Sequence, residues 1–334
     1  MGNNILITGA SGFIGSFFVE EALKRKYQVF AGIRSTSSKK YLTDPGIHFL
    51  ELNYNDPASL DITLNTIAAK YGGFDYIIHN AGLIKAKSNA DYFSVNFENT
   101  KKLVDALKRN NLTPHKFIYI SSLAAFGPGE GSNPITEHQI QKPITAYGLS
   151  KLKSEQFLYA TRDFPFLIIN STAVYGPREK GFLLPLKLIE KHLEFYISSP
   201  KQLLSFVHVQ DFCKAVFLSI GSSAINRRFL VSDLNVYTPK IFNLIGKTTL
   251  NKKTIQINIP PSLAWLLASF SEILGRITRE ASVLNRERLK EFKSLNWKAD
   301  CSEIIKLGYK PQFNLEEGLK QTIQWYQEQG WLKN

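Results

Sequence analysis

The sequence predicts an α/β protein with a doubly wound parallel sheet and a smaller, mostly helical C-terminal cap that binds substrate. Three observations support this class. Short apolar runs alternate with amphipathic stretches of helix length through the first half, a glycine-rich turn at 9–15 follows the first run, and helical segments dominate after Gly176-Pro177. With 334 residues, 44% of them hydrophobic, the chain can bury a full core. We expect a sheet domain over 1–176 and a cap over 177–334, with segments around 204–232 returning to the sheet domain.

The expected elements follow from the period of the apolar residues. The strands are expected at 5–8, 28–33, 47–52, 76–79, 117–121 and 167–171. The cap helices are expected at 183–192, 209–220, 239–247, 263–274, 282–293 and 315–328. Ligands of open α/β sheets bind at the carboxyl ends of the strands, so the cap should lie at that edge.

The turn after the first strand has the composition of an anion site. It reads Gly9-Ala10-Ser11-Gly12-Phe13-Ile14-Gly15 and leads directly into a helix. Glycine lets the backbone bend and approach a pyrophosphate, and a helix N-terminus presents free N–H groups to it. We therefore expect a dinucleotide to contact Gly9, Ser11, Gly12, Phe13, Ile14 and Gly15.

Tyr147 and Lys151 are four residues apart on an expected helix, so they share one face. A neighbouring ammonium favours the phenolate and should lower the pKa of the Tyr147 phenol from about 10. A tyrosine four residues before a base is common by chance. The pair gains meaning from its place downstream of the glycine turn.

The end of the second strand indicates which cofactor is bound. An acidic side chain there would hydrogen-bond the ribose 2′-OH of NAD, but the chain reads Arg34-Ser35-Thr36-Ser37. Arg34 can bind a 2′-phosphate in bidentate fashion, with the hydroxyls of Ser35 and Ser37 nearby. NADP is therefore expected over NAD.

The glycine spacing together with Tyr-x-x-x-Lys resembles the short-chain dehydrogenase/reductase superfamily, in its extended branch of Rossmann-type epimerases, dehydratases and reductases. Five further segments carry the resemblance in order: His79-Asn80-Ala81-Gly82, Val95-Asn96, Ser121-Ser122, Val174-Tyr175-Gly176-Pro177-Arg178 and Phe206-Val207-His208-Val209-Gln210-Asp211. The resemblance covers nearly the whole chain.

This resemblance implies roles for particular residues. Ser122, Tyr147 and Lys151 would be catalytic, with Ser121 as the fallback for Ser122 and Asn96 either supporting the site or capping a helix. Beyond the glycine turn, Arg34 and Ser35, the cofactor would contact Asn53, Ala81, Gly82, Tyr147, Lys151, Thr172 and Val174. The substrate would contact Ser122, Tyr175, Phe182 and His208.

Departures from the family pattern narrow the reaction. Leu123-Ala124 replaces the Asp-Glu pair of the dehydratases, which disfavours elimination. Leu204 stands where nucleotide-sugar epimerases usually have a phosphate-binding Arg, and Asn170-Ser171 replaces a frequent Arg-Pro. The C-terminal half resembles the dihydroflavonol-reductase and 3β-hydroxysteroid-dehydrogenase-like members, whose substrates are less polar. Leu266, Leu267 and Phe270 could line such a pocket or simply pack in the core.

The leading hypothesis is an NADPH-dependent carbonyl reductase, or the reverse alcohol dehydrogenase. The alternative is a nucleotide-sugar epimerase with tightly bound cofactor. A remote third class is a nucleotide-sensing or nucleic-acid-binding protein on an enzyme scaffold, which only the net charge of +13 supports. The basic residues are spread along the chain, so we expect no nucleic-acid groove.

Composition restricts the remaining possibilities. Two cysteines, Cys213 and Cys301, make a disulfide framework improbable, and six histidines without ligand spacing indicate no metal. The sequence has no run of ~18 apolar residues, so no membrane insertion is predicted. A cytoplasmic protein is expected. A homodimer is expected through helices around 93–108 and 147–159. Their apolar residues are Leu103, Val104, Leu107, Leu152, Phe157 and Leu158.

Overall fold

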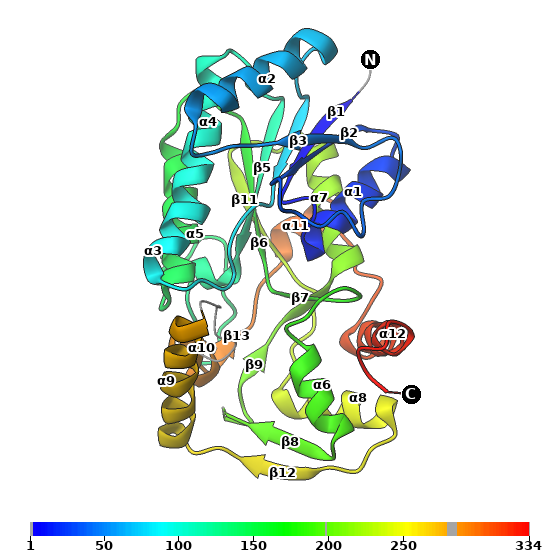
Figure 1. Cartoon of the computed structure of the whole chain (residues 1–334). Helices are drawn as coiled ribbons and strands as arrows, with labels where there is room; N and C mark the ends of the chain where they lie inside the picture. The colour runs from blue at the N-terminus through cyan, green and yellow to red at the C-terminus, as the bar shows by residue number, and fades with distance from the viewer. Residues whose placement is uncertain (1–2, 198, 279–285, 334) are drawn as a thin grey trace.

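The computed structural model describes residues 3–197, 199–278 and 286–333. Its centre is a seven-stranded sheet in the order β11-β6-β5-β4-β1-β2-β3, with every pair parallel (Figure 1). The strands are β1 (Asn4–Thr8), β2 (Gln28–Ile33), β3 (His48–Glu51), β4 (Tyr76–His79), β5 (Lys116–Ser122), β6 (Phe166–Ser171) and β11 (Arg227–Val231). The chain leaves β1 toward β2 on one side and returns to β4 on the other, which makes the carboxyl end of β1 the topological switch point where such sheets bind ligands.

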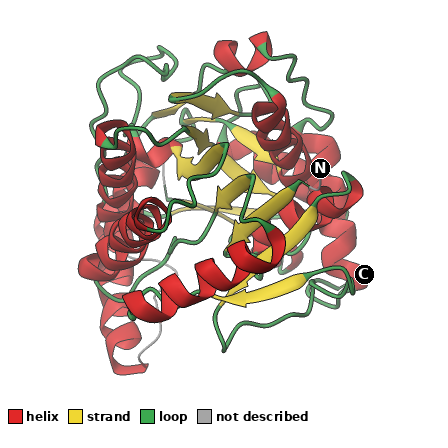
Figure 2. Cartoon of the chain, turned by 90° about the horizontal axis from the view of Figure 1, so that it is seen from above, coloured by secondary structure: helices red, strands yellow, loops and turns green. Residues whose placement is uncertain are grey.

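Helices cover both faces of this sheet, as the view from above shows (Figure 2). On one face a core forms with α1 (Phe13–Lys24), α7 (Val209–Gly221) and α11 (Ser302–Lys306). On the other face a second core forms with α2 (Pro57–Tyr71), α4 (Asn99–Arg109) and α5 (Ala146–Ala160). The expected doubly wound parallel α/β class is confirmed.

The rest of the chain builds a smaller part below this sheet in Figure 1. It contains three two-stranded parallel pairs: β7 (Ala173–Tyr175) with β10 (Phe206–His208), β8 (Leu193–Tyr196) with β12 (Ile255–Asn258), and β9 (Leu203–Leu204) with β13 (Asn296–Trp297). A third core joins α6 (Leu183–Glu190), α8 (Pro239–Leu250) and α12 (Leu315–Glu328). A small separate cluster joins α9 (Pro261–Thr278) to α10 (Arg286–Lys293).

Several elements differ from expectation. The edge strand β11 and the three short pairs were not expected, because two to five residues give little periodic signal. The helix expected at 282–293 is seen from Arg286, and positions 282–285 lie outside the described residues.

Four of the six apolar residues expected at a dimer contact pack in the sheet-side core instead. Leu103, Val104, Leu107 and Leu158 are fully buried in the core on the α4–α5 side. Leu152 is also buried and Phe157 is partly buried against that core. The homodimer itself stays a prediction, and the four fully buried residues do not carry it.

The described residues offer neither a membrane span nor a metal site. None of their helices combines the length and apolar character needed to cross a bilayer. No group of three or more His, Cys, Asp or Glu side chains within them is arranged to hold a metal ion.

Candidate active site

The turn between β1 and α1 has the shape of a dinucleotide cradle. Gly9 has a φ of +65°, and a Cβ there would lie 2.9 Å from the Cα of Ala81 at the end of β4. A Cβ at Gly15 would collide with the carbonyl oxygen of Gly9. Helix α1 begins after Gly12, which offers no side chain to cap the first turn. The free N–H groups of this turn therefore suit a pyrophosphate, and the residues fit a nicotinamide dinucleotide.

A buried histidine fixes the end of β4 beside this cradle. The ring nitrogens of His79 lie 2.9 Å from Thr8 Oγ1 and 3.0 Å from Thr100 Oγ1. Burial lowers the pKa of His79 to about 3, so the ring is neutral and links β1, β4 and α4. Thr8 Oγ1 also accepts a hydrogen bond from the Ala81 N–H at 3.1 Å.

Asn96 joins the segment after β4 to the helix that carries Tyr147 and Lys151. It lies fully buried in a π-helical turn at Phe93–Glu98, between α3 (Asn89–Tyr92) and α4. Its Oδ1 accepts from the Leu83 N–H at 2.7 Å, and its Nδ2 donates to Leu83 O at 3.1 Å and Ser150 Oγ at 3.0 Å. Asn96 supports the site, and the competing role as a helix cap is wrong. Such π-bulges often occur at functional sites.

Gly82 leaves room for the expected catalytic lysine. A Cβ at Gly82 would lie 3.3 Å from Lys151 Nζ and 3.0 Å from Asn96 Oδ1. Gly82 itself is exposed. The backbone here is therefore open to a ligand and pressed against the lysine on its other side.

The structure brings Ser122 and Tyr147 together. Ser122 ends β5, and Tyr147 lies in the first turn of α5, whose N-cap Thr145 accepts from the Gly148 N–H at 3.1 Å. A Cβ at Gly148 would collide with the Ala124 carbonyl, so this glycine lets α5 approach the turn Leu123–Ala125. Burial raises the pKa of Tyr147 to about 12, and a hydrogen bond with Ser122 opposes that rise. The expected lowering of this pKa is therefore wrong: the phenol is protonated at neutral pH.

Lys151 lies one turn further along α5 and is 4% exposed. Its Nζ donates to Ile120 O at 2.9 Å and lies 4.8 Å from the ring centre of Tyr119. Burial lowers the pKa of Lys151 to about 8, and the charge of Glu155 opposes this shift. The lysine is thus mostly charged at pH 7 but close to its titration range.

Glu155 is the centre of a buried polar network behind Ser122. Its carboxylate accepts hydrogen bonds from Ser121 Oγ at 2.5 Å, Asn170 Nδ2 at 2.6 Å and Gln141 Nε2 at 2.7 Å. The Arg228 guanidinium from β11 lies 3.4 Å away. Ser121 is committed to this network, which favours Ser122 over Ser121 as the catalytic hydroxyl.

Asn170 has a defined place in the same network. Its Nδ2 also donates to the carbonyl oxygen of Ser122 at 3.1 Å. The position that departs from the family's Arg-Pro therefore holds the backbone at Ser122. The guanidinium that faces Glu155 comes from a different strand.

Helix α10 contacts the N-terminus of α5 from a distant part of the chain, which sequence reasoning missed. Glu287 Oε2 accepts from the Ala146 N–H at 2.7 Å, and Glu291 Oε1 accepts from Thr145 Oγ1 at 3.4 Å. Carboxylates stabilise a helix N-terminus because they satisfy free N–H groups and oppose the helix dipole. Between these two acids, Arg288 lowers the pKa of Tyr147, whereas Glu291 raises it. No local pattern could have revealed these contacts.

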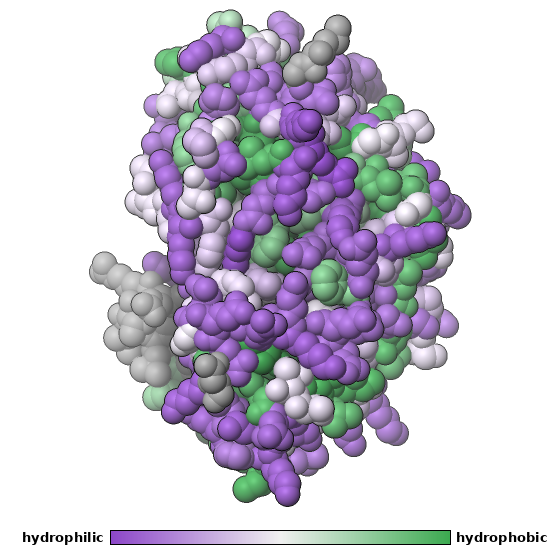
Figure 3. All heavy atoms as spheres, turned by 90° about the vertical axis from the view of Figure 1, so that its right-hand side faces the viewer, coloured by the Kyte–Doolittle hydropathy of each residue, from purple (hydrophilic) through white to green (hydrophobic). Residues whose placement is uncertain are grey.

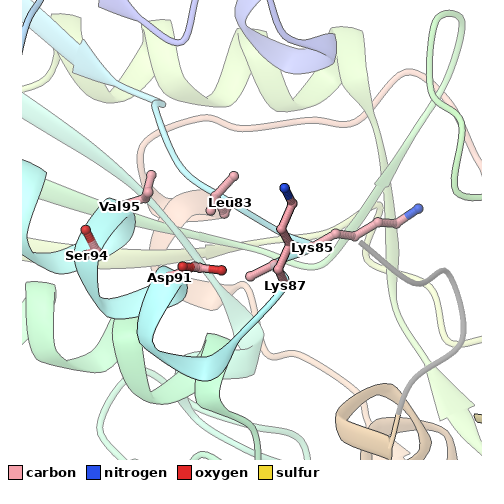
Figure 4. A pocket seen from close by; sticks show the side chains of 7 residues that line it. Leu83, Lys85, Lys87, Asp91, Ser94 and Val95 are labelled. Carbon is pink, nitrogen blue, oxygen red and sulfur yellow. The ribbon is translucent and has the colours of Figure 1, made fainter. Parts of the chain in front are cut away.

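A pocket of about 340 Å³ opens beside the segment after β4 (Figure 4). It is lined by Leu83, Lys85, Ala86, Lys87, Asp91, Ser94 and Val95. Burial and the charge of Arg288 lower the pKa of Lys85. The lining thus combines two lysines, Lys85 and Lys87, with one acid, Asp91.

The residues expected to select the cofactor lie at the ends of the next strands. Arg34 and Ser35 are exposed just beyond β2, where the Arg34 N–H donates to Ser37 Oγ at 3.0 Å. Asn53 is exposed beyond β3 and accepts from the Asn55 N–H at 3.1 Å. These positions share the carboxyl edge of the sheet with Gly9.

Three of the expected substrate contacts lie in or against an aromatic core. Tyr175 is buried and donates to Asn314 O at 3.0 Å. His208 is fully buried, with its ring centre 4.2 Å from that of Phe313, and burial lowers its pKa to about 4. Phe182 packs in the same aromatic core. Burial therefore speaks against Tyr175 and His208 as substrate contacts, whereas Phe182 is partly exposed and stays a predicted one.

Two expected cofactor contacts lie where β6 passes into β7. Thr172 is buried and its Oγ1 donates to Val231 O at 3.0 Å, whereas Val174 is partly exposed. Of these two residues, only Val174 is accessible to a cofactor.

Arg178 is a second feature that sequence reasoning missed. It has a φ of +75° in the loop after β7 and reaches back to α1. Its guanidinium donates to Ser16 Oγ at 2.9 Å and Glu20 Oε1 at 2.5 Å. The guanidinium also lies over the rings of Phe17 and Tyr41, at 4.3 and 4.5 Å from their centres. This contact ties the C-terminal half to the cofactor helix.

Comparisons with known proteins agree with this geometry. The chain is 27% identical over 333 residues to the decarboxylating sterol-4-alpha-carboxylate 3-dehydrogenase of Dictyostelium discoideum, covering 95% of this chain and 98% of that protein. It is 23% identical to the ceramide reductase of Caulobacter vibrioides, covering 98% and 96%. The crystal structure of UDP-glucose 4-epimerase from Thermotoga maritima with UDP-glucose superposes with a TM-score of 0.77 at 21% identity, covering 98% and 99%, which shows the shared fold.

A match to a family model confirms the expected resemblance to the extended short-chain branch. The model described as "NAD dependent epimerase/dehydratase family" matches residues 5–231, about two thirds of the chain. The matched range begins in β1 and ends with β11, so it spans the whole parallel sheet and Ser122, Tyr147 and Lys151. The protein belongs to the NAD dependent epimerase/dehydratase family and is an enzyme of the extended short-chain type.

Proposed function

We propose that the protein is an NADP-dependent oxidoreductase that reduces a carbonyl group, or oxidises the matching alcohol, with Ser122, Tyr147 and Lys151. The observation that carries this proposal is the position of Tyr147 in the first turn of α5, next to Leu123-Ala124, where burial raises the pKa of the phenol and Ser122 opposes that rise. A proton donor is present, and no carboxylate pair for elimination stands at 123–124.

The roles follow from the positions of the side chains. Gly9, Gly12 and Gly15 hold the pyrophosphate, and the charged Lys151 stands where the family binds the nicotinamide ribose. The bound cofactor supplies a hydride to the carbonyl carbon. Tyr147 Oη gives its proton to the carbonyl oxygen, and Ser122 Oγ hydrogen-bonds the same oxygen. One hydride and one proton thus convert a ketone to an alcohol, and Tyr147 recovers its proton from solvent.

A substrate with an apolar body fits the site better than a nucleotide sugar. Leu204 replaces the phosphate-binding Arg expected of epimerases. Relatives of similar length are named for a sterol carboxylate and a ceramide. Lys85 and Arg288 provide positive charge near the site for an acidic group on such a substrate. We propose a lipid-like ketone as the substrate class.

The preference for NADP is proposed on the chemistry of Arg34. Its guanidinium matches a 2′-phosphate, and no acidic residue stands at 35–37 to oppose it. In a thermal-shift titration at ~100 times Kd, NADP should stabilise the fold by roughly 2.7 kcal/mol and NAD by less. Arg34→Ala should abolish the difference, while Lys26→Ala, a basic control after α1, should not. A larger shift with NAD, or unchanged NADP affinity in Arg34→Ala, contradicts the assignment.

Epimerisation is the second candidate, because it needs the same tyrosine and lysine on the fold shared with UDP-glucose 4-epimerase. Cofactor consumption separates the two reactions. A reductase oxidises one NADPH per product over many turnovers, whereas an epimerase interconverts UDP-sugars without net cofactor change. We expect NADPH oxidation with a panel of steroid and long-chain ketones. Epimerised UDP-sugar with no NADPH oxidation would refute the reductase.

A further inference from the structure

Over residues 263–270, helix α9 buries its alanines and exposes its large apolar residues. Ala264 is 1% exposed and Ala268 is 0% exposed, and they pack with Leu289 of α10. Leu263, Leu266, Leu267 and Phe270 follow the spacing i, i+3, i+4 and i+7, so they form one stripe on the helix. We call these four residues the α9 stripe.

The α9 stripe is neither core nor the wall of an enclosed pocket. Leu266 is 59% exposed and Phe270 is 60% exposed, and Trp265 beside them is half exposed. Of the two roles expected for Leu266, Leu267 and Phe270, packing in the core is therefore wrong. Exposed apolar stripes of this kind mark a contact surface. By contrast, the face on the right-hand side of Figure 1 is covered mostly by hydrophilic residues (Figure 3).

Basic residues accompany the stripe. From 239 to 298 the sequence has eleven Lys and Arg and four Asp and Glu. Two of those acids, Glu287 and Glu291, accept hydrogen bonds at the N-terminus of α5, and the other carboxylate oxygen of Glu287 pairs with Lys290 Nζ at 2.5 Å. The exposed row of α10 is Arg286, Lys290 and Lys293, at i, i+4 and i+7.

The basic row of α10 lies next to the face that packs on α9. That face carries Leu289 and Phe292, which belong to the α9–α10 cluster. Leu289 is followed directly by Lys290, and Phe292 by Lys293. The apolar contact with α9 and the exposed cations therefore lie on neighbouring faces of α10. The apolar stripe and the cations belong to one pair of helices at the edge of the molecule (Figure 1).

We infer that α9 and α10 dock the enzyme on an anionic lipid bilayer, with the α9 stripe at the acyl boundary and the α10 cations at the headgroups. Leu, Phe and Trp on one face with nearby Lys and Arg are what an interfacial helix requires. The cations select a negatively charged surface over a neutral one. Because α10 also caps α5 beside Tyr147, docking here brings the bilayer to the catalytic helix.

The test is vesicle co-sedimentation of the full chain. The probes are vesicles of phosphatidylcholine alone and of phosphatidylcholine mixed with phosphatidylglycerol. We expect binding to the mixed vesicles, weakened by salt, and little binding to the neutral ones. The triple variant Leu266→Ser, Leu267→Ser, Phe270→Ser should bind at least ~10-fold more weakly. The matched control replaces three exposed isoleucines elsewhere: Ile62→Ser, Ile140→Ser, Ile225→Ser.

A second pair of variants tests the charges. Lys290→Gln with Lys293→Gln should reduce binding to the mixed vesicles, whereas Lys108→Gln with Lys320→Gln should not. All replaced side chains are exposed, so each variant should fold. Urea unfolding checks this for each one. Binding of the triple variant equal to that of the wild type, or no binding of the wild type, overturns the proposal. So does a stripe-dependent dimer in light scattering without vesicle binding. No turnover is measured, so the outcome is independent of the reductase assignment.

Discussion

The first turn and the middle of α5 are held in different ways, although both carry proposed catalytic side chains. At the first turn, Ala146 and Thr145 are capped by Glu287 and Glu291 from α10, in the smaller part of the molecule. In the middle, Lys151 and Glu155 are anchored to β5, β6 and β11 of the large sheet. The environment of Tyr147, the proposed proton donor, therefore depends on the cap, whereas that of Lys151 depends on the sheet. Changes in the cap can adjust acid–base chemistry without disturbing the cofactor side.

The largest effect should come from Tyr147→Phe. It removes the transferable proton and leaves the sheet contacts intact, so turnover should fall by ~10²–10⁴-fold with nearly unchanged cofactor affinity. Lys151→Ala should weaken both turnover and cofactor binding. Steady-state rates and cofactor titration measure the two quantities. Tyr147→Phe activity within a few-fold of the wild type would refute the proton-donor role.

Glu155→Gln should weaken the contacts that hold the middle of α5 to the large sheet. Arg228 is largely buried, and removing its carboxylate partner leaves a charge unpaired, which typically costs about 3–5 kcal/mol. Urea unfolding should show this loss in the free energy of unfolding. Glu51→Gln, at an exposed position on β3, is the control and should change it by less than about 0.5 kcal/mol. An equal loss in both variants would show that the network does not stabilise the fold.

Lys151 predicts a pH dependence of opposite sign for activity and stability. Folding lowers its pKa from 10.5 to about 8. Activity that needs the ammonium should therefore decline above pH 8. Between about pH 8 and 10.5 the unfolded chain holds this proton and the native protein does not, so Lys151 contributes a rise in stability with pH there. Glu155→Gln should move the activity decline to lower pH, because Glu155 raises the pKa of Lys151. A decline that Glu155→Gln leaves in place contradicts this assignment.

The smallest effects should come from the cap side. Glu287→Gln or Glu291→Gln should each cost about 0.5–2 kcal/mol of unfolding free energy, as the loss of a helix cap does. Glu291→Gln should also lower the pKa of Tyr147, since the Glu291 charge raises it. Ultraviolet titration of the phenolate, taken as the difference between each protein and its Tyr147→Phe counterpart, reports that shift, and Glu316→Gln on α12 serves as the control. A variant that alters cofactor affinity more than turnover would show that the two sides of α5 are not separable.

The parts of the site that could be predicted are local in sequence. The turn at 9–15 combines strand, glycines and helix within a dozen residues, and Tyr147 and Lys151 are one helical turn apart. The two contacts of α10 with α5 join residues that lie 141 and 146 positions apart in the sequence. No pattern near either residue indicates them. Arg228 and Glu155 likewise meet only because β11 lies beside β6.

Tyr175 and His208 show a different limit. Their chemistry suits substrate binding, but packing decides their place. Gly318 of α12 leaves the space that the Tyr175 ring fills, and a Cβ there would collide with the phenol oxygen. The ring of Phe313 covers His208. The side-chain type alone could not distinguish a ligand from a core residue here.

The Arg178 contact has a consequence for engineering chimeras. A graft that exchanged the C-terminal half at Gly176 for that of a relative would carry a new residue into the space between Ser16, Glu20 and the rings of Phe17 and Tyr41. Those four partners belong to the half that stays behind. A chimera with a new substrate specificity therefore needs its crossover after Arg178, so that the arginine and its contacts with α1 come from the same parent protein.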